Sequence, residues 1–79
     1  MTKTEEKKLK SKIAHILGTR PNFITIRDVV RETPNHYTVY YTVQASYKGF
    51  WYLIQMQNYN IIRISREVSW HEQIYQNQR

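Results

Sequence analysis

A strict alternation of apolar and polar side chains between residues 37 and 47 is the clearest pattern in this chain. The apolar positions are Tyr37, Val39, Tyr41, Val43, Ala45 and Tyr47. A period of two places neighbouring side chains on opposite faces of a β-strand, so this stretch predicts a strand with one buried face. After Lys48-Gly49, where glycine tolerates the positive φ of a tight turn, residues 50–57 continue the alternation. The pattern therefore predicts a β-hairpin with Tyr41 opposite Met56.

One further strand is expected on each side of this hairpin. Before it, residues 23–31 place Ile24, Ile26 and Val30 on one side, with Asp28 interrupting that apolar side. The other side of this strand would carry Arg27 beside Tyr40 in the next strand.

After the hairpin, a three-residue turn at residues 58–60 leads into a strand over residues 61–65. With that turn, Ile62 is expected opposite Met56 and Ile64 opposite Ile54. Both pairs then lie on the same face as the buried side of the hairpin, so pattern and turn lengths agree on a four-stranded antiparallel meander.

The first element is predicted to be a helix over residues 3–18. Its apolar positions recur at the spacing of a single buried stripe, at Leu9, Ile13, Ile16 and Leu17. Thr2 or Thr4 can cap its start, where Glu5 and Glu6 place negative charge at the positive end of the helix dipole. Gly18 supplies its end.

Together these elements predict a single small α+β domain spanning residues 1–79. The helix packs on a meander that occupies residues 22–65, in the order α-β-β-β-β. Residues 66–79 are expected to form a tail or a short helix, because their larger side chains recur at helical spacing at Glu67, Trp70, His71, Ile74 and Tyr75.

The second face of the sheet carries the functional signal. It is polar but is interrupted by large side chains and arginines, at Arg27, Tyr40, Trp51, Leu53 and Arg63. A sheet needs one apolar face to fold, so rings on the other face indicate a partner. That partner could be another protein, a second copy of the chain or the tail itself. Alternatively, the rings could stabilise an exposed sheet as cross-strand neighbours, or stack on nucleic-acid bases.

Net charge adds a second candidate surface. The chain carries +6, and residues 1–20 hold six basic and two acidic side chains. Lys7, Lys8, Lys10 and Lys12 crowd the outer side of the predicted helix. Such lysines are typical of a solvated helix, and they are also suited to non-specific contacts with phosphates.

Catalytic chemistry has little support. The chain has no cysteine, its only glycines are Gly18 and Gly49, and its three histidines are scattered. We therefore expect no enzyme activity, no catalytic residues, no metal site and no cofactor. The longest apolar run, residues 50–54, is far below the about 20 residues of a membrane span, so no membrane insertion is expected.

No secretory signal is evident, which favours a cytoplasmic location. The leading interpretation is a small basic accessory or adaptor protein, or a self-associating domain, that binds through its second sheet face. The alternative interpretation is a nucleic-acid-binding domain that uses the helix lysines for phosphates and the sheet aromatics and arginines for bases.

Overall fold

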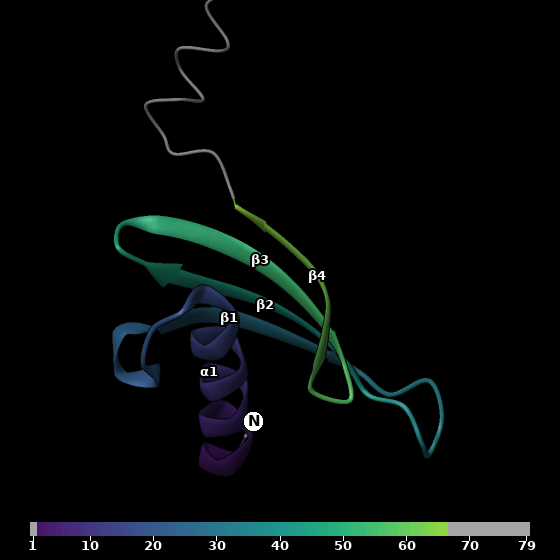
Figure 1. Cartoon of the computed structure of the whole chain (residues 1–79). Helices are drawn as coiled ribbons and strands as arrows, with labels where there is room; N and C mark the ends of the chain where they lie inside the picture. Colours follow the sequence, from purple (N-terminus) through teal and green to yellow (C-terminus); the bar gives the residue numbers. More distant parts are fainter. Residues whose placement is uncertain (1, 67–79) are drawn as a thin grey trace, which may run out of the picture.

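The computed structural model describes residues 2–66 and confirms the predicted order of elements (Figure 1). The elements are helix α1 (Lys3–Leu17), the short 3₁₀ helix η1 (Pro21–Phe23), and strands β1 (Thr25–Glu32), β2 (Tyr40–Tyr47), β3 (Phe50–Gln57) and β4 (Asn60–Arg66). The strands form one antiparallel sheet in the order β1-β2-β3-β4. The expected tail or short helix lies outside the described residues, except for Arg66, which ends β4.

Both ends of α1 are capped by the residues expected from the sequence. The hydroxyl of Thr2 accepts a hydrogen bond from the backbone N–H of Glu5 at 3.1 Å. At the other end, Gly18 adopts the left-handed conformation with φ of +69°, and the N–H of Thr19 donates to the carbonyl of Ala14 at 2.8 Å. These bonds pair backbone groups that a helix end otherwise leaves free.

Helix α1 packs against one face of the sheet, which we call the inner face. The residues buried between helix and sheet are Leu9, Ile13, Ala14, Ile24, Tyr41, Val43, Ala45, Ile54 and Met56. The prediction for Ile16 was wrong, because 53% of this residue is exposed. The helix approaches the sheet on the flank that carries Ala14, which leaves Ile16 on the opposite flank in solvent.

The central hairpin has the predicted register. Tyr41 lies opposite Met56, and Val43 lies opposite Ile54. Lys48 and Gly49 form its two-residue turn with φ of +52° and +80°. Two successive positive φ angles match the right-handed twist of the adjoining strands, which is why such turns close tight hairpins.

Strand β1 contains a bulge that reverses its alternation. Ile26 lies opposite Ala45, but the next pair joins Asp28 to Gln44, so Arg27 is an extra residue. The predicted register of β1 was wrong, because Glu32, not Arg27, lies opposite Tyr40. The bulge also reverses the predicted faces of Asp28 and Val30, whereas Arg27 lies on the outer face as predicted. The bulge takes Asp28 out of the inner face, which spares the large cost of burying an unpaired carboxylate.

The connection between β3 and β4 also departs from the prediction. The turn has two residues, Asn58 and Tyr59, with φ of +49° and +68°, in place of three. This shorter turn places Ile61, not Ile62, opposite Met56, and a second bulge at Ile62 then restores the predicted register. Ile64 lies opposite Ile54 as expected.

The side chain of Asn58 fixes this turn against the segment before β2. Its Oδ1 accepts from the N–H of Val39 at 2.8 Å, and its Nδ2 donates to the carbonyl of Tyr37 at 3.1 Å. These bonds hold the turn in place, and Tyr59 packs against the edge of the core in a conformation that is unusual for a bulky residue.

Candidate interaction surfaces

The sheet face opposite α1, which we call the outer face, is not covered by any other part of residues 2–66 (Figure 1). It carries the five residues predicted as a partner-binding surface, Arg27, Tyr40, Trp51, Leu53 and Arg63. Two further aliphatic side chains lie on it, because the bulge in β1 turns Val30 outward and the two-residue turn before β4 turns Ile62 outward. Val30 is 48% exposed and Ile62 is 58% exposed. The alternation of the sequence predicted both on the inner face, and this prediction was wrong.

Arg27 and Trp51 form the best-defined contact on the outer face. The Arg27 guanidinium carbon lies 5.1 Å from the centroid of the Trp51 ring, within the range of a cation–π interaction. Arg27 is the extra residue of the bulge, between the pairs Ile26–Ala45 and Asp28–Gln44, so it lies at the end of the sheet that carries Trp51. The stacked guanidinium occupies part of the ring surface that a base would need.

Tyr40 lies far from Trp51 along the sheet. Tyr40 begins β2, whereas Trp51 lies opposite Ser46 near the end of that strand. Six residues of strand separate the two positions, which corresponds to about 20 Å. The rings therefore form two separate contact points.

Each ring has its own surroundings. A hollow beside Tyr40 is also lined by Glu32, Thr42, Gln55 and Ile62. Between Tyr40 and Trp51, Leu53 and Arg63 line a smaller hollow of about 140 Å³ with Gln55 and Ser65.

In residues 2–66 the charges on the outer face balance, and both carboxylates lie at one edge of the sheet. Asp28 and Glu32 lie on β1 at one edge of the sheet, and Arg63 lies on β4 at the other edge. With Arg27 included, the face carries two positive and two negative side chains. Because Arg27 offsets one of the two carboxylates, the outer side of β1 has a net charge of −1, and that of β4 has a charge of +1 from Arg63.

Three of the four predicted lysines gather on a different surface. A shallow groove of about 550 Å³ is lined by Thr4, Lys7, Lys8, Ser11, Lys12 and Tyr59. The Lys8 ammonium lies 5.3 Å from the centroid of the Tyr59 ring. Lys10 does not line this groove, and its ammonium lies 3.6 Å from a carboxylate oxygen of Glu6.

The lysine groove and the outer face lie on opposite sides of the sheet, because α1 packs on the inner face. The structure therefore does not bring the helix lysines together with Tyr40, Trp51 and the outer-face arginines. A ligand bound flat on the outer face does not reach the lysine groove.

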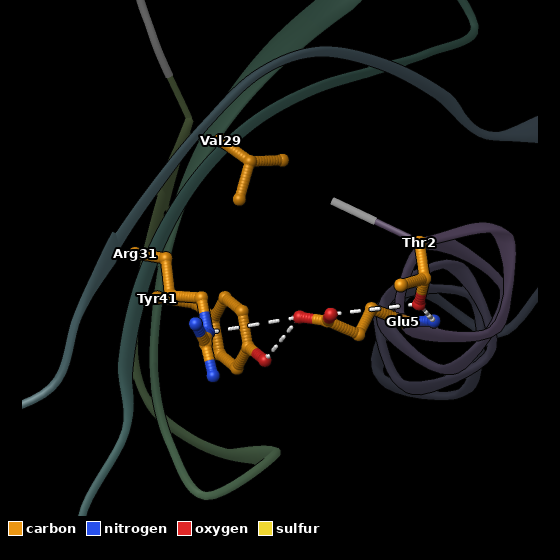
Figure 2. A pocket seen from close by; sticks show the side chains of 5 residues that line it. All are labelled: Thr2, Glu5, Val29, Arg31 and Tyr41. Atoms are coloured by element: carbon orange, nitrogen blue, oxygen red, sulfur yellow. Dashed lines mark hydrogen bonds and ion pairs between the residues drawn. The ribbon is translucent and has the colours of Figure 1, made fainter.

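A third cluster, shown in Figure 2, joins the start of α1 to the sheet. The hydroxyl of Tyr41 donates to Oε2 of Glu5 at 3.0 Å, and Nε of Arg31 lies 3.7 Å from the same oxygen. The hydroxyl of Thr2 donates to Oε1 of Glu5 at 3.4 Å. The hydroxyls of Tyr41 and Tyr59 share a further hydrogen bond at 3.2 Å.

These contacts shift the acidities of both partners. The hydrogen bond from Tyr41 is the main cause that lowers the pKa of Glu5, with a smaller contribution from Arg31. Burial, followed by hydrogen bonding to Tyr59 and Glu5, raises the pKa of Tyr41 to about 12. At neutral pH the carboxylate is therefore charged and the phenol neutral, so the cluster acts as a tether between helix and sheet. Sequence analysis assigned Glu5 only to the helix dipole.

No protein-family model matches the chain, and no curated protein and no solved structure is significantly similar to it. Within residues 2–66, no three side chains of His, Cys, Asp or Glu are grouped as metal ligands would be. In the same residues, no helix has the length and apolar character needed to cross a membrane. A function therefore has to be argued from the surfaces themselves.

Proposed function

We propose that this protein is a small, non-enzymatic binding module whose outer face associates with the outer face of a second copy of the chain. The observation that carries this proposal is the composition of that face. It exposes Val30, Tyr40 and Ile62 beside the half-buried Trp51 and Leu53, and its charges sum to zero. Exposed aliphatic and aromatic groups with balanced charge are suited to burial against protein.

Nucleic acid fits the outer face less well. Binding to phosphates requires an excess of positive charge, whereas Asp28 and Glu32 offset the two arginines. The stacking surface is also limited, since Arg27 already lies on Trp51 and Tyr40 is about 20 Å away along the strand. Val30 and Ile62 have no flat ring on which a base could stack.

The separation of charge favours a second copy as the partner. A two-fold axis that runs along the strands, between two facing sheets, places β1 of each copy over β4 of the other. Arg63 shares a row across the sheet with Val30, through Thr42 and Gln55. In the dimer, Arg63 then lies over the partner's β1 between the acidic positions 28 and 32, and the contact occurs twice.

The area is sufficient for such an interface. Four strands of seven or eight residues, spaced by about 4.8 Å with about 3.4 Å per residue, present a face of about 500 Å². Two such faces bury about 1,000 Å² or more, which is near the lower limit for a specific protein interface. We therefore expect a reversible dimer.

Sedimentation equilibrium tests the proposal directly. The wild-type chain of 9.7 kDa should double its apparent mass as its concentration rises. Ile62→Lys and Trp51→Ala should each weaken dimerisation at least tenfold, because each change removes apolar contact area from the interface. Tyr37→Lys is the matched control, since Tyr37 is 88% exposed in the loop before β2 and lies outside the interface.

A charge exchange tests the predicted orientation. Arg63→Glu alone, and the double variant Asp28→Lys/Glu32→Lys alone, should each remain monomeric, because their homodimers bring like charges together. Mixed in equal amounts, the two proteins should form a heterodimer in which every charge pair is attractive. A monomeric wild type at all concentrations, or a mixture that stays monomeric, would contradict the proposal.

A further inference from the structure

We infer that the groove between α1 and Tyr59 binds the phosphodiester backbone of a nucleic acid without regard to base sequence. This groove lies on the side of the sheet opposite the proposed dimer surface, and the inference does not rest on that proposal. Its lining consists of Lys7, Lys8, Lys12, two hydroxyl side chains and the Tyr59 ring. The helix part of this lining is a regular array.

The array follows from the helical repeat. Thr4, Ser11 and the three lysines recur at intervals of three and four residues, so they share one side of α1. From Thr4 to Lys12 the helix rises about 12 Å. Ammonium and hydroxyl groups are interspersed along this length, and both are common donors to phosphate oxygens.

The positive charge of this groove is not neutralised by nearby carboxylates. Among residues 2–66, none of those that line it is acidic. Of the four acidic residues in the part of the chain that the structure describes, Glu5 binds Tyr41 and lies near Arg31, and Glu6 pairs with Lys10. The other two, Asp28 and Glu32, lie on β1 and reach the outer face. The three lysines of the groove thus form a local excess of positive charge that suits a polyanion.

The chemistry of the groove favours a phosphate backbone over bases or an apolar peptide. The Tyr59 ring is in contact with Lys8 and lies 5.3 Å from the Tyr41 ring, centroid to centroid, so it is not free to stack on a base. In the part of the chain that the structure describes, the groove lining includes no aliphatic residue that could anchor an apolar side chain of a peptide. Positive charges and hydroxyls remain, which provide affinity but no base specificity.

Fluorescence anisotropy with a labelled 20-base-pair DNA duplex tests the inference, with an RNA duplex and a single strand as further arms. Three lysine–phosphate contacts predict a slope of about −2.7 for log affinity against log salt on a duplex. This slope corresponds to about 40-fold weaker binding at 200 mM than at 50 mM salt. Similar affinities for DNA and RNA duplexes of different sequence are expected, because only the backbone is contacted.

A pair of double variants separates the groove from the total charge. Lys8→Ala/Lys12→Ala should reduce the slope to about −0.9, because one groove lysine remains. Lys3→Ala/Lys10→Ala also removes two positive charges, but both lie outside the groove, so this variant should leave the slope unchanged. Lys10 serves well as a control because it lies about 200° around the helix from Lys8. Circular dichroism verifies that both variants are folded.

Several results would overturn the inference. One is the absence of binding at 20 mM salt, and another is an equal loss of binding in the two double variants. A third is tighter, lysine-dependent binding to vesicles of anionic lipid or to a polyglutamate peptide than to the duplex. The Arg63→Glu variant should still bind the duplex, so a failure of the dimer proposal is distinguishable from a failure of this one.

Discussion

Tyr41 connects the buried sheet face to the first turn of α1, and Tyr41→Phe isolates the contribution of its hydroxyl. The ring is 2% exposed and keeps its packing in the variant. The hydroxyl donates to the Glu5 carboxylate at 3.0 Å and shares a hydrogen bond with Tyr59 at 3.2 Å. The substitution therefore removes one charge-assisted and one neutral hydrogen bond without creating a cavity.

The expected loss follows from the solvent around these groups. A hydrogen bond to a charged group contributes about 1.5–3 kcal/mol when its partners are buried. The Glu5 side chain is 25% exposed, so water can replace part of the lost bond. We therefore expect a decrease of about 1 kcal/mol in the free energy of unfolding, or about 4–8 °C in Tm for a domain of this size.

The pH dependence provides a sharper check. The folded state lowers the pKa of Glu5 below its ordinary value of 4.5, so this stabilisation is present above that pH and is lost as the pH falls through the lowered pKa. The difference between wild type and Tyr41→Phe should thus shrink at pH 3. Folding also raises the pKa of Tyr41 from 10.0 to about 12, so the wild type loses stability between those values and the phenylalanine variant does not.

Thermal denaturation followed by circular dichroism at pH 3, 7 and 11 measures these differences. Tyr37→Phe is the control, because Tyr37 is 88% exposed and its hydroxyl can be replaced by water; the Tm of this variant should match that of the wild type at every pH. A Tyr41→Phe protein with the Tm of the wild type at pH 7, or with the same deficit at all three pH values, would refute this account of the tether.

Two further substitutions test the fold. Gly49→Ala should lower the urea midpoint by an amount equivalent to about 1 kcal/mol, because Gly49 has φ of +80°, which is unfavourable for a residue with a Cβ atom. The added Cβ meets no atom within 4 Å, so the loss would come from backbone strain alone, and an unchanged midpoint would contradict this prediction. Ile13→Ala should cost about 2–5 kcal/mol because Ile13 is fully buried, whereas Ile16→Ala should cost less than about 0.5 kcal/mol. Equal losses in these two variants would show that the assignment of the buried stripe is incorrect.

The central hairpin could be predicted because two independent signals agree there. Alternation fixes which residues of β2 and β3 face inward, and the Lys48-Gly49 turn independently fixes their register. The helix was predictable for a similar reason, since its cap, its apolar stripe and its terminal glycine all indicate the same boundaries. Where a single signal was available, as for Ile16, the prediction failed.

The edge strands could not be predicted in full because a bulge has no strong signature in composition. One extra residue reverses the faces of everything that follows it. In β1, alternation without a bulge would have buried the carboxylate of Asp28, and this unfavourable position indicated an irregularity. In the structure Arg27 is the extra residue of a bulge, and Asp28 lies on the outer face. In β4 no comparable sign exists, because Ile61 and Ile62 are the same residue type and either fits the inner face.

These bulges also explain how far the candidate surfaces could be predicted. The five residues proposed for the outer face lie there, but two further aliphatic side chains were missed: the bulge in β1 turns Val30 outward, and the two-residue turn before β4 turns Ile62 outward. The lysine array follows from helical spacing alone. Its contact with Tyr59 depends on the two-residue turn before β4, which the sequence did not reveal.

The two proposed surfaces, the outer face and the lysine groove, lie on opposite sides of the molecule, and this arrangement decides what a dimer could bind. The outer face and α1 lie on opposite sides of one sheet, so dimerisation through the outer faces leaves both helices on the outside of the assembly. The two lysine grooves are then separated by the thickness of two sheets, which is at least about 10 Å, and they face away from one another. A rigid duplex bound in one groove does not extend into the other. Dimerisation would therefore hold two nucleic-acid segments side by side, with each segment contacting one chain.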